Sequence, residues 1–404
     1  MGRRVTIGAW ARVRARAAAK AAMGAAAAML SAGCAYAPMP AMSVWSGGEV
    51  PVPVWYVTDR APDAALGFGP RWGAALSCGR VSVTVAGAGT PVRQSATGPV
   101  QDCDGDAAMA AFAGQAAAAA RAATGWDGQP CRRLLLAVHG FNNTFADAVT
   151  RAGQVAHDVA WPCPVLAFTW SSEGRMDRYA ADAERSGYSV PYLIALLQAL
   201  KAQGLTTDLI AHSMGNRLAL SALSALCARQ EQPSPLAGQV ILAAPDVNAE
   251  RLNDDFQIFL RKSAPCARRI TVYASENDLA LIASETLHGG IPRAGRRPRT
   301  NLQYPGEAAL AGKVEVIDAT DAPGGDTGHG YYADSYEMAR DVMWVLDGAT
   351  LARRAEAAAP YDGGLTCRDG HGDACSGGRY VLTVAKDRRP SWRFRLIRQL
   401  WPRF

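Results

Sequence analysis

Short apolar runs alternate with amphipathic stretches along most of this chain. Turn residues bound the apolar runs, which predict β-strands at 50–57, 81–85, 134–138, 165–170, 209–210, 240–244, 270–274 and 314–317. The amphipathic and alanine-rich stretches predict helices at 107–123, 144–160, 190–200, 216–226 and 332–346. Continuous apolar strands separated by helices indicate a mostly parallel sheet with helices on both faces. In such α/β sheets, functional groups gather at the carboxyl ends of the strands.

The most informative polar residue follows the strand at 209–210. Ser213 stands between this strand and the helix predicted from 216, with the small residues Ala211 and Gly215 two places before and after it. A serine on such a tight strand-to-helix turn is typical of a nucleophile, because the turn lifts the hydroxyl above the sheet. The alternative interpretation is a polar turn in which Ser213 caps the helix. The pattern favours the nucleophile.

A second turn that fits this chemistry follows the strand at 134–138, in the run His139-Gly-Phe-Asn-Asn143. The backbone N–H of Phe141, together with that of Met214 at the helix start, would form an oxyanion hole for an acyl-transfer reaction. A plain glycine turn, with Asn143 or Thr144 capping the next helix, is the alternative. The two interpretations are compatible.

A serine nucleophile needs a general base, and six histidines are candidates. His329 lies on a glycine-flanked loop after the last strand, from which its ring can reach over the serine. His288, in a loop rich in Arg, Gly and Pro, is the second choice. We expect backbone or packing roles for the others, which are His139, His157, His212 and His371.

Two aspartates compete for the role of the acid that orients the base. Asp246 and Asp278 each follow a predicted strand, and either could be an ordinary helix cap. The chain order nucleophile, acid, base, with the acid two strands beyond the serine, favours Asp278. Asp246 stays open as the alternative acid.

Several sequence blocks together carry a resemblance to a known superfamily. They are Trp55–Arg60, His139–Asn143, Ala211–Gly215, Ala244–Asp246, Leu287–Gly295 and Gly328–Tyr332. The chain resembles the α/β-hydrolase superfamily and, within it, a bacterial group of exported esterase/lipase-like proteins of poorly characterised function. The resemblance covers roughly residues 50–348. It implies an eight-stranded, mostly parallel sheet and a catalytic triad of Ser213, Asp278 and His329.

The charge pattern points to export. The formal charge is +6, and the six basic residues before Cys34 account for all of it, since no acid precedes Cys34. The rest of the chain is balanced, which argues against nucleic acid as a partner. Residues 1–33 predict a lipoprotein-like signal peptide with Cys34 as a lipidated mature N-terminus, or alternatively ordinary cleavage near Ala35–Ala37. We expect a linker at 34–49, the hydrolase domain at 50–348 and a C-terminal extension at 349–404.

The number of cysteines agrees with export of the protein. Eight cysteines remain after Cys34, an even number that predicts disulfides in an oxidising compartment. Two pairs are predicted. Cys131 and Cys163 each precede a strand, and those strands are expected to be neighbours; Cys367 and Cys375 bracket a loop rich in Gly and Asp.

These observations predict a serine hydrolase that cleaves carboxylic esters and needs no metal or organic cofactor. The expected partner is a small-molecule or lipid ester. The membrane is a further expected partner, through Cys34 and the basic, aromatic tail at 386–404, although this tail could equally dock on the domain. The alternatives are an acyltransferase with the same triad and a non-catalytic, lipid-anchored binding or envelope scaffold protein.

Two segments are candidates for specificity. We expect residues 171–189 to overhang the sheet. The loop at 286–306 carries the arginines that could meet an anionic group or could simply be solvated, which are Arg293, Arg296, Arg297 and Arg299.

Overall fold

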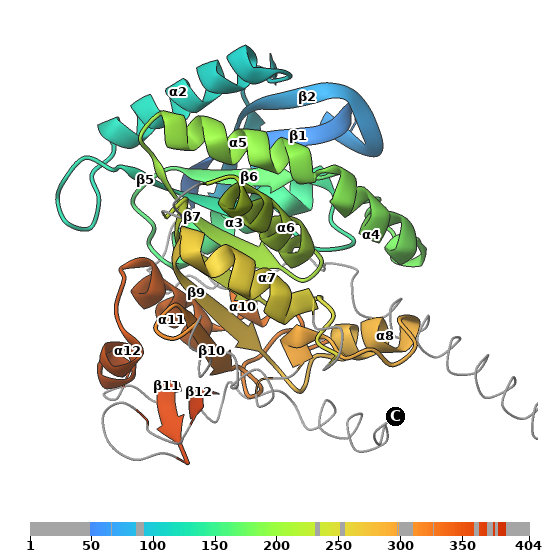
Figure 1. Cartoon of the computed structure of the whole chain (residues 1–404). Helices are drawn as coiled ribbons and strands as arrows, with labels where there is room; N and C mark the ends of the chain where they lie inside the picture. The colour runs from blue at the N-terminus through green and yellow to red at the C-terminus, as the bar shows by residue number, and fades with distance from the viewer. Residues whose placement is uncertain are drawn as a thin grey trace, which may run out of the picture.

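The protein is described by a computed structural model that covers residues 49–384 except 66, 86–92, 231–234, 251–254, 297, 299–309, 326, 359–362, 370–374 and 376–378. These residues form one twelve-stranded sheet in the order β11-β12-β10-β9-β8-β7-β5-β6-β1-β2-β3, with β4 paired to β2 (Figure 1). The strands are β1 (Val50–Asp63), β2 (Gly67–Val85), β3 (Arg93–Thr97), β4 (Gln101–Asp102), β5 (Arg133–Val138), β6 (Val165–Thr169), β7 (Thr206–His212), β8 (Ala237–Ala243), β9 (Ala267–Ala274), β10 (Val314–Asp318), β11 (Gly363–Arg368) and β12 (Arg379–Val384).

The centre of the sheet is parallel, from β1 through β6, β5, β7, β8, β9 and β10 to β12. The α/β class predicted from the sequence is therefore confirmed, and all eight predicted strands are present. The predicted strand number is wrong, because β3, β4, β11 and β12 extend the two edges. These four strands are short and partly exposed, so they lack the continuous apolar runs of the central strands.

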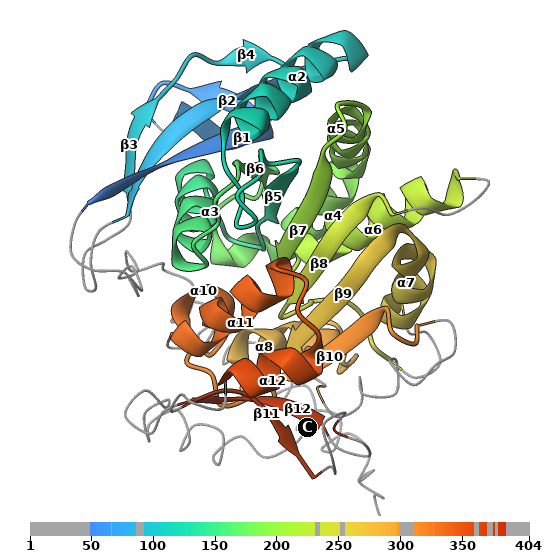
Figure 2. The same ribbon diagram turned by 90° about the vertical axis from the view of Figure 1, so that its left-hand side faces the viewer.

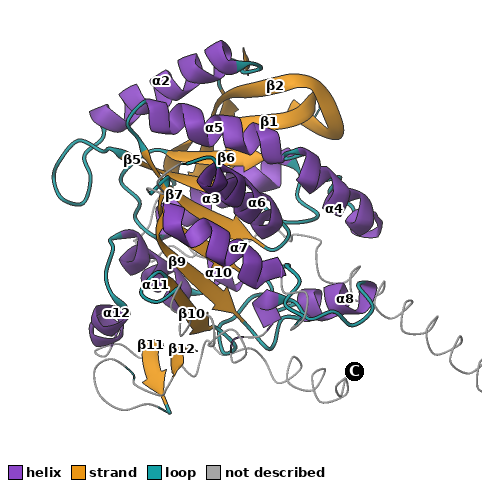
Figure 3. Cartoon of the chain, viewed as in Figure 1, coloured by secondary structure: helices purple, strands orange, loops and turns teal. Residues whose placement is uncertain are grey.

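Helices cover both faces of the sheet, as Figure 2 shows, and Figure 3 shows them packed around the strands. Two apolar cores result, one on each face. Phe112 and Phe256 belong to the first core, Phe145 and Tyr331 to the second. The first face is covered by α2 (Asp106–Ala122), α5 (Val190–Ala202), α6 (Gly215–Ala228) and α7 (Asp255–Ser263), and the second by α3 (Phe145–Asp158), α10 (Tyr331–Asp334) and α11 (Tyr336–Leu346).

The helices follow the sequence pattern with one interruption. The helix predicted at 332–346 is divided into α10 and α11 at Ser335, whose backbone is extended and whose hydroxyl accepts the N–H of Met338 at 3.3 Å. A serine N-cap of this kind starts a new helix. Four further helices of the described chain lie outside the predicted set: α4 (Tyr179–Tyr188) in the segment expected to overhang the sheet, α7, α8 (Leu279–Leu287) and α12 (Leu351–Ala358).

The region after residue 348 packs on the same sheet. Strand β12 pairs in parallel with β10, and β11 pairs antiparallel with β12. On α12, Arg354 is fully buried and pairs with Asp341 at 2.7 Å and with Glu315 at 2.6 Å. These two ion pairs tie α12 to α11 and β10. The predicted extension therefore contributes to the sheet up to Val384, and its basic tail lies outside the described residues, as do the predicted signal peptide, Cys34 and most of the linker.

Four disulfides join Cys78 to Cys103, Cys131 to Cys163, Cys227 to Cys266 and Cys367 to Cys375. The second and fourth are the two pairs predicted from the sequence. Bonds of this kind persist in oxidising compartments, which supports an exported protein. Among the helices in the described ranges, none is both long and apolar enough to cross a membrane.

Candidate active site

Ser213 lies on the turn between β7 and α6. Its φ is 53°, in the left-handed region that costs a residue with a side chain about 1–2 kcal/mol. Neighbouring segments hold this turn: the Ser213 N–H donates to the Ala243 carbonyl at 3.0 Å, and the Ser213 carbonyl accepts the N–H of Asp246 at 3.2 Å. The hydroxyl makes no hydrogen bond to the part of the chain that the structure describes. The turn thus presents, at the carboxyl end of a central strand, a hydroxyl that has no hydrogen-bond partner among the described residues.

Two glycines allow the chain to pack closely around Ser213. A Cβ on Gly140 would lie 2.8 Å from the Cβ of Ser213, and a Cβ on Gly215 would collide with the carbonyl oxygen of His139. Real Cβ atoms do not approach other atoms so closely, so both positions require glycine. The turn at 139–143 is therefore fixed directly beside the serine.

The predicted oxyanion-hole donors lie on these two turns. Neither the N–H of Phe141 nor that of Met214 donates to an acceptor among the residues that the structure describes. The Phe141 turn is held by Asn143, whose Nδ2 donates to the Phe141 carbonyl at 2.8 Å. Met214 is the N-cap of α6, where the helix dipole favours negative charge. Both N–H groups are therefore available to a ligand.

Asp278 and His329 meet although 51 residues separate them. The Asp278 Oδ2 lies 2.6 Å from the His329 Nδ1, and the other carboxylate oxygen accepts the N–H of Leu281 at 2.9 Å as the N-cap of α8. Asp278 is therefore both a helix cap and a histidine partner, so the two interpretations of this residue hold together. With Nδ1 donating to the carboxylate, Nε2 of His329 is left as the basic nitrogen.

The residue before the serine holds the histidine loop in place. His212 is buried, and its Nε2 donates to the His329 carbonyl at 3.1 Å. Its ring stacks on Tyr332, with centroids 4.2 Å apart, and lies 4.5 Å from the His329 ring. Burial lowers the pKa of His212 well below its ordinary value, so this ring is neutral. His329 therefore lies against the residue that directly precedes Ser213, and among the described residues no hydrogen bond joins the Ser213 and His329 side chains.

Charge around His329 favours its protonated form. Burial alone would lower the pKa of His329, but the Asp278 carboxylate outweighs this effect, and the pKa is raised above its ordinary value. A neutral imidazole with a raised pKa is a stronger base. The pair can therefore accept a proton and stabilise the resulting cation.

The alternative acid, Asp246, is placed in a different network. Its buried carboxylate accepts hydrogen bonds from the hydroxyls of Tyr179 and of Ser284, the latter at 2.7 Å. It also lies 3.5 Å from Arg217 and 3.4 Å from Arg293. Burial would raise the pKa of Asp246, yet the two guanidinium groups outweigh burial and lower it. Asp246 therefore pairs with arginines, while Asp278 pairs with the histidine.

The other histidines have structural partners. His139 stacks on Trp170 at 4.9 Å, and burial lowers its pKa to about 3. His157 lies beside Asp158 at 3.1 Å on α3. The second candidate base, His288, donates its Nδ1 to the Ser284 carbonyl at 2.8 Å, and no carboxylate within the described ranges forms a hydrogen bond to its ring. His371 lies outside the described residues.

The comparison with protein families decides the classification. A family model described as "Alpha/beta hydrolase of unknown function (DUF900)" matches residues 116–345, more than half of the 404-residue chain. The chain belongs to this family. As a member of this α/β-hydrolase family, it carries Ser213, Asp278 and His329 within the matched stretch. The superfamily resemblance predicted from the sequence blocks is thereby confirmed.

The comparisons with solved structures and with curated proteins say less about this chain than the family model does. The solved structure of phospholipase PlaB from Legionella pneumophila is similar at 13% identity and a TM-score of 0.22, over 51% of this chain. The match covers 42% of the PlaB chain, so this α/β hydrolase spans less than half of that protein's length. A likeness at this level adds nothing about function. No curated protein matches the chain.

Proposed function

We propose that this α/β hydrolase is a serine esterase that cleaves carboxylic esters through an acyl-enzyme on Ser213. The observation that carries the proposal is the 2.6 Å hydrogen bond between Asp278 and His329, on a loop beside the strained Ser213 turn. Ester cleavage needs a nucleophile, an oriented base and free N–H donors, and here these groups follow the carboxyl ends of central strands.

The first half of the reaction forms the acyl-enzyme. Ser213 Oγ attacks the ester carbonyl carbon while its proton passes to Nε2 of His329. Asp278 keeps the imidazole in the correct tautomer and stabilises the imidazolium. The carbonyl oxygen becomes an oxyanion, which the N–H groups of Phe141 and Met214 bind. The imidazolium then gives its proton to the departing alkoxide, and an alcohol leaves.

The second half releases the acid. Water attacks the acyl carbon and gives a proton to His329, and the tetrahedral intermediate collapses to break the bond to Ser213. The imidazolium returns its proton to the serine oxygen, so the enzyme is regenerated and one ester and one water become an acid and an alcohol. An acyltransferase would replace this water by another alcohol.

The direct test is hydrolysis of short p-nitrophenyl esters by the disulfide-bonded protein. We expect turnover in water that follows Michaelis–Menten kinetics. Turnover only when an acceptor alcohol is added would favour the acyltransferase. Absence of both reactions in folded protein would favour the non-catalytic scaffold.

The pH dependence of the reaction should report on His329. Only the neutral imidazole can take the serine proton, so kcat/KM should rise with pH, with a midpoint above the ordinary histidine value of 6.5. In the Asp278→Asn variant the midpoint should fall, because burial then acts without the carboxylate. The measurement is the pH–rate profile of both proteins. A midpoint that Asp278→Asn leaves unchanged would assign the titration to another group.

The contribution of His329 to folding stability should change with pH in the opposite direction to kcat/KM. A histidine pKa raised by folding stabilises the protein below the unfolded value, and this contribution disappears as the pH rises through the folded value. The esterase is therefore expected to gain activity over the pH range in which it loses this small part of its stability.

We further propose that the esterase works at the cell envelope, anchored through lipidated Cys34. Four disulfides and the predicted leader support export, and the tail at 386–404 would add contacts to an anionic membrane surface. Fractionation of cells expressing the full chain or the Cys34→Ala variant tests the anchor. We expect the variant to leave the membrane fraction, whereas equal membrane retention would contradict the proposal.

A further inference from the structure

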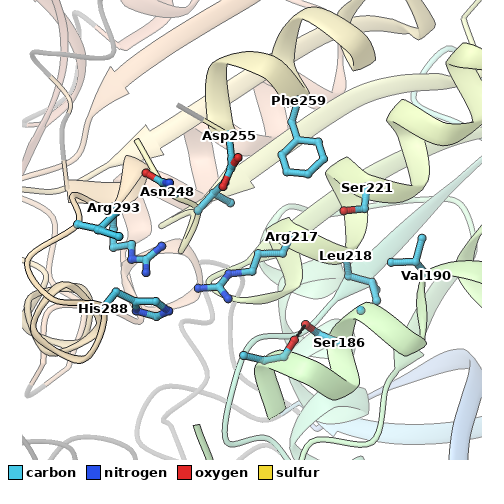
Figure 4. Close-up of a pocket in the computed structure, with 14 residues that line it drawn as sticks. Ser186, Val190, Arg217, Leu218, Ser221, Asn248, Asp255, Phe259, His288 and Arg293 are labelled. Carbon is cyan, nitrogen blue, oxygen red and sulfur yellow. Dashed lines mark hydrogen bonds between the residues drawn. The ribbon is translucent and has the colours of Figure 1, made fainter. Parts of the chain in front are cut away.

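A cavity of about 380 Å³ is lined in part by α6, the helix that follows the Ser213 turn (Figure 4). We call it the side cavity; it is open to solvent on one side and is lined by α4, α5, α6, α7, residues 247–248 and the loop at 288–293. Arg217, on its wall, lies in the first turn of α6, the helix that begins directly after the Ser213 turn. Asp246 lies between the serine turn and the cavity, because it touches both Ser213 and Arg217. The side cavity is therefore adjacent to the reaction centre.

Three basic side chains converge in this space. Figure 4 shows the guanidinium groups of Arg217 and Arg293 and the ring of His288 pointing toward one another. They come from α6, from the loop after α8 and from the end of α8. From the sequence, Arg293 was one of the loop arginines that could meet an anionic group, His288 was the second candidate base, and Arg217 carried no prediction.

Arg293 is poorly paired for a buried guanidinium. Its exposed fraction is 2%, and its Nε and Nη2 make no hydrogen bond within the described ranges. The nearest carboxylate atom, an oxygen of Asp246, is 3.4 Å from Nε. A buried charge without hydrogen bonds costs several kcal/mol. An anion at this position would supply the missing acceptors.

The carboxylates around the cavity do not supply the hydrogen-bond acceptors that the Arg293 guanidinium lacks. Asp246 is shared with Arg217 and already accepts hydrogen bonds from Tyr179 and Ser284. Glu285 binds the Arg293 backbone N–H at 3.1 Å and the side chain of another arginine. Asp255 is on the cavity wall but is exposed to solvent at the start of α7. One buried carboxylate therefore faces two guanidinium groups.

The other side of the side cavity is largely apolar, with the hydroxyls of Ser186 and Ser221 among its side chains (Figure 4). Val190, Leu218 and Phe259 lie there, on α5, α6 and α7. A ligand that matches both walls has an anionic end and a hydrocarbon part. Guanidinium groups bind carboxylate and phosphate oxygens through two parallel hydrogen bonds, which makes these anions the best fit.

We propose that the side cavity binds a phosphate or carboxylate group between Arg217 and Arg293, and that this group belongs to an amphiphilic ester substrate. The second half of this statement rests on the proposed esterase function. The first half does not, because anion binding can be measured without turnover.

The first experiment measures anion binding alone. Inorganic phosphate is titrated into the Ser213→Ala variant by calorimetry, and thermal denaturation is followed in parallel. We expect saturable binding that is lost on adding Arg293→Gln. Because that change could unfold the protein, Ser221→Leu is the second variant: it fills the cavity from α6 and leaves both arginines in place. Binding that survives both changes would overturn the site.

The second experiment measures specificity with two esters of equal chain length, p-nitrophenyl hexanoate and the mono-p-nitrophenyl ester of adipate. Hydrogen bonds to a charged group favour the adipate ester by about ten- to a hundredfold in kcat/KM. Arg293→Gln and Ser221→Leu should bring this ratio close to one. Arg175→Gln is the matched control, since it removes an exposed arginine outside the cavity and should keep the ratio.

Failure of the proposed anion site and failure of the proposed esterase function would give different results. Phosphate binding that depends on Arg293, without turnover of any ester, would keep the anion site and reject the esterase. Equal turnover of both esters by the parent protein, without phosphate binding, would keep the esterase and reject the site. Phosphate should also raise KM for the adipate ester without changing kcat; an effect on kcat alone would contradict the assignment to the substrate.

Discussion

Replacing Ser213 by alanine is expected to lower kcat for p-nitrophenyl ester hydrolysis by about 10⁵–10⁶-fold, the loss typical of a removed serine nucleophile. The reason is that no other hydroxyl occupies the turn between β7 and α6 beside the Phe141 and Met214 N–H groups. Background hydrolysis from those donors and from substrate binding should remain. The measurement is the steady-state rate with purified parent and variant proteins.

The variant should keep its fold. The hydroxyl of Ser213 makes no hydrogen bond within the described residues, and alanine meets the same backbone strain as serine at a φ of 53°. Melting temperatures of the two proteins should therefore agree within a few degrees. Undiminished ester hydrolysis by a folded Ser213→Ala protein would show that the nucleophile lies elsewhere.

The Asp278→Asn variant is expected to lose about 10⁴-fold in kcat, as when the acid of a serine triad is replaced by its amide. An amide at this position can donate a hydrogen bond to Nδ1 of His329. The neutral ring then carries its proton on Nε2, so Nε2 cannot accept the proton of Ser213. Asparagine also caps helices well, so α8 and the overall stability should be little affected. Kinetics and urea denaturation of the variant measure both effects.

Asp246→Asn is the matched control, because it tests the alternative acid by the same change. Its removal leaves Arg217 and Arg293 without their buried partner, which should cost about 3–5 kcal/mol of stability. The folded fraction should keep kcat to within about tenfold. The reverse pattern, with catalysis lost in Asp246→Asn and retained in Asp278→Asn, would exchange the roles of the two aspartates.

The central sheet could be predicted from the sequence because its strands are buried on both faces and therefore continuously apolar. The strand β8 is buried at every residue, whereas in β11 only Leu365 and its neighbour Gly364 are buried. Edge strands of the second kind have no distinct pattern. The helix α4 was missed for a similar reason, since only Asp182 and Ser186 are buried along it.

The site was predictable where local sequence determines local shape. Ser213 stands on a turn set by Gly215, and His329 on a glycine-flanked loop. The choice between Asp246 and Asp278 was not local, because both follow strands. It depends on which carboxylate the loop at 328–332 reaches across the sheet. The side cavity is also non-local, since its two arginines are 76 residues apart in the chain.

The central claim is that Ser213 is an activated nucleophile, and covalent labelling tests it most directly. The folded, disulfide-bonded protein is treated with a fluorophosphonate probe, and the modified peptide is identified by mass spectrometry. The account predicts one label per chain, on Ser213, that is strongly reduced in the Asp278→Asn variant. A folded protein that takes no label, or takes it on a different residue, would contradict the account.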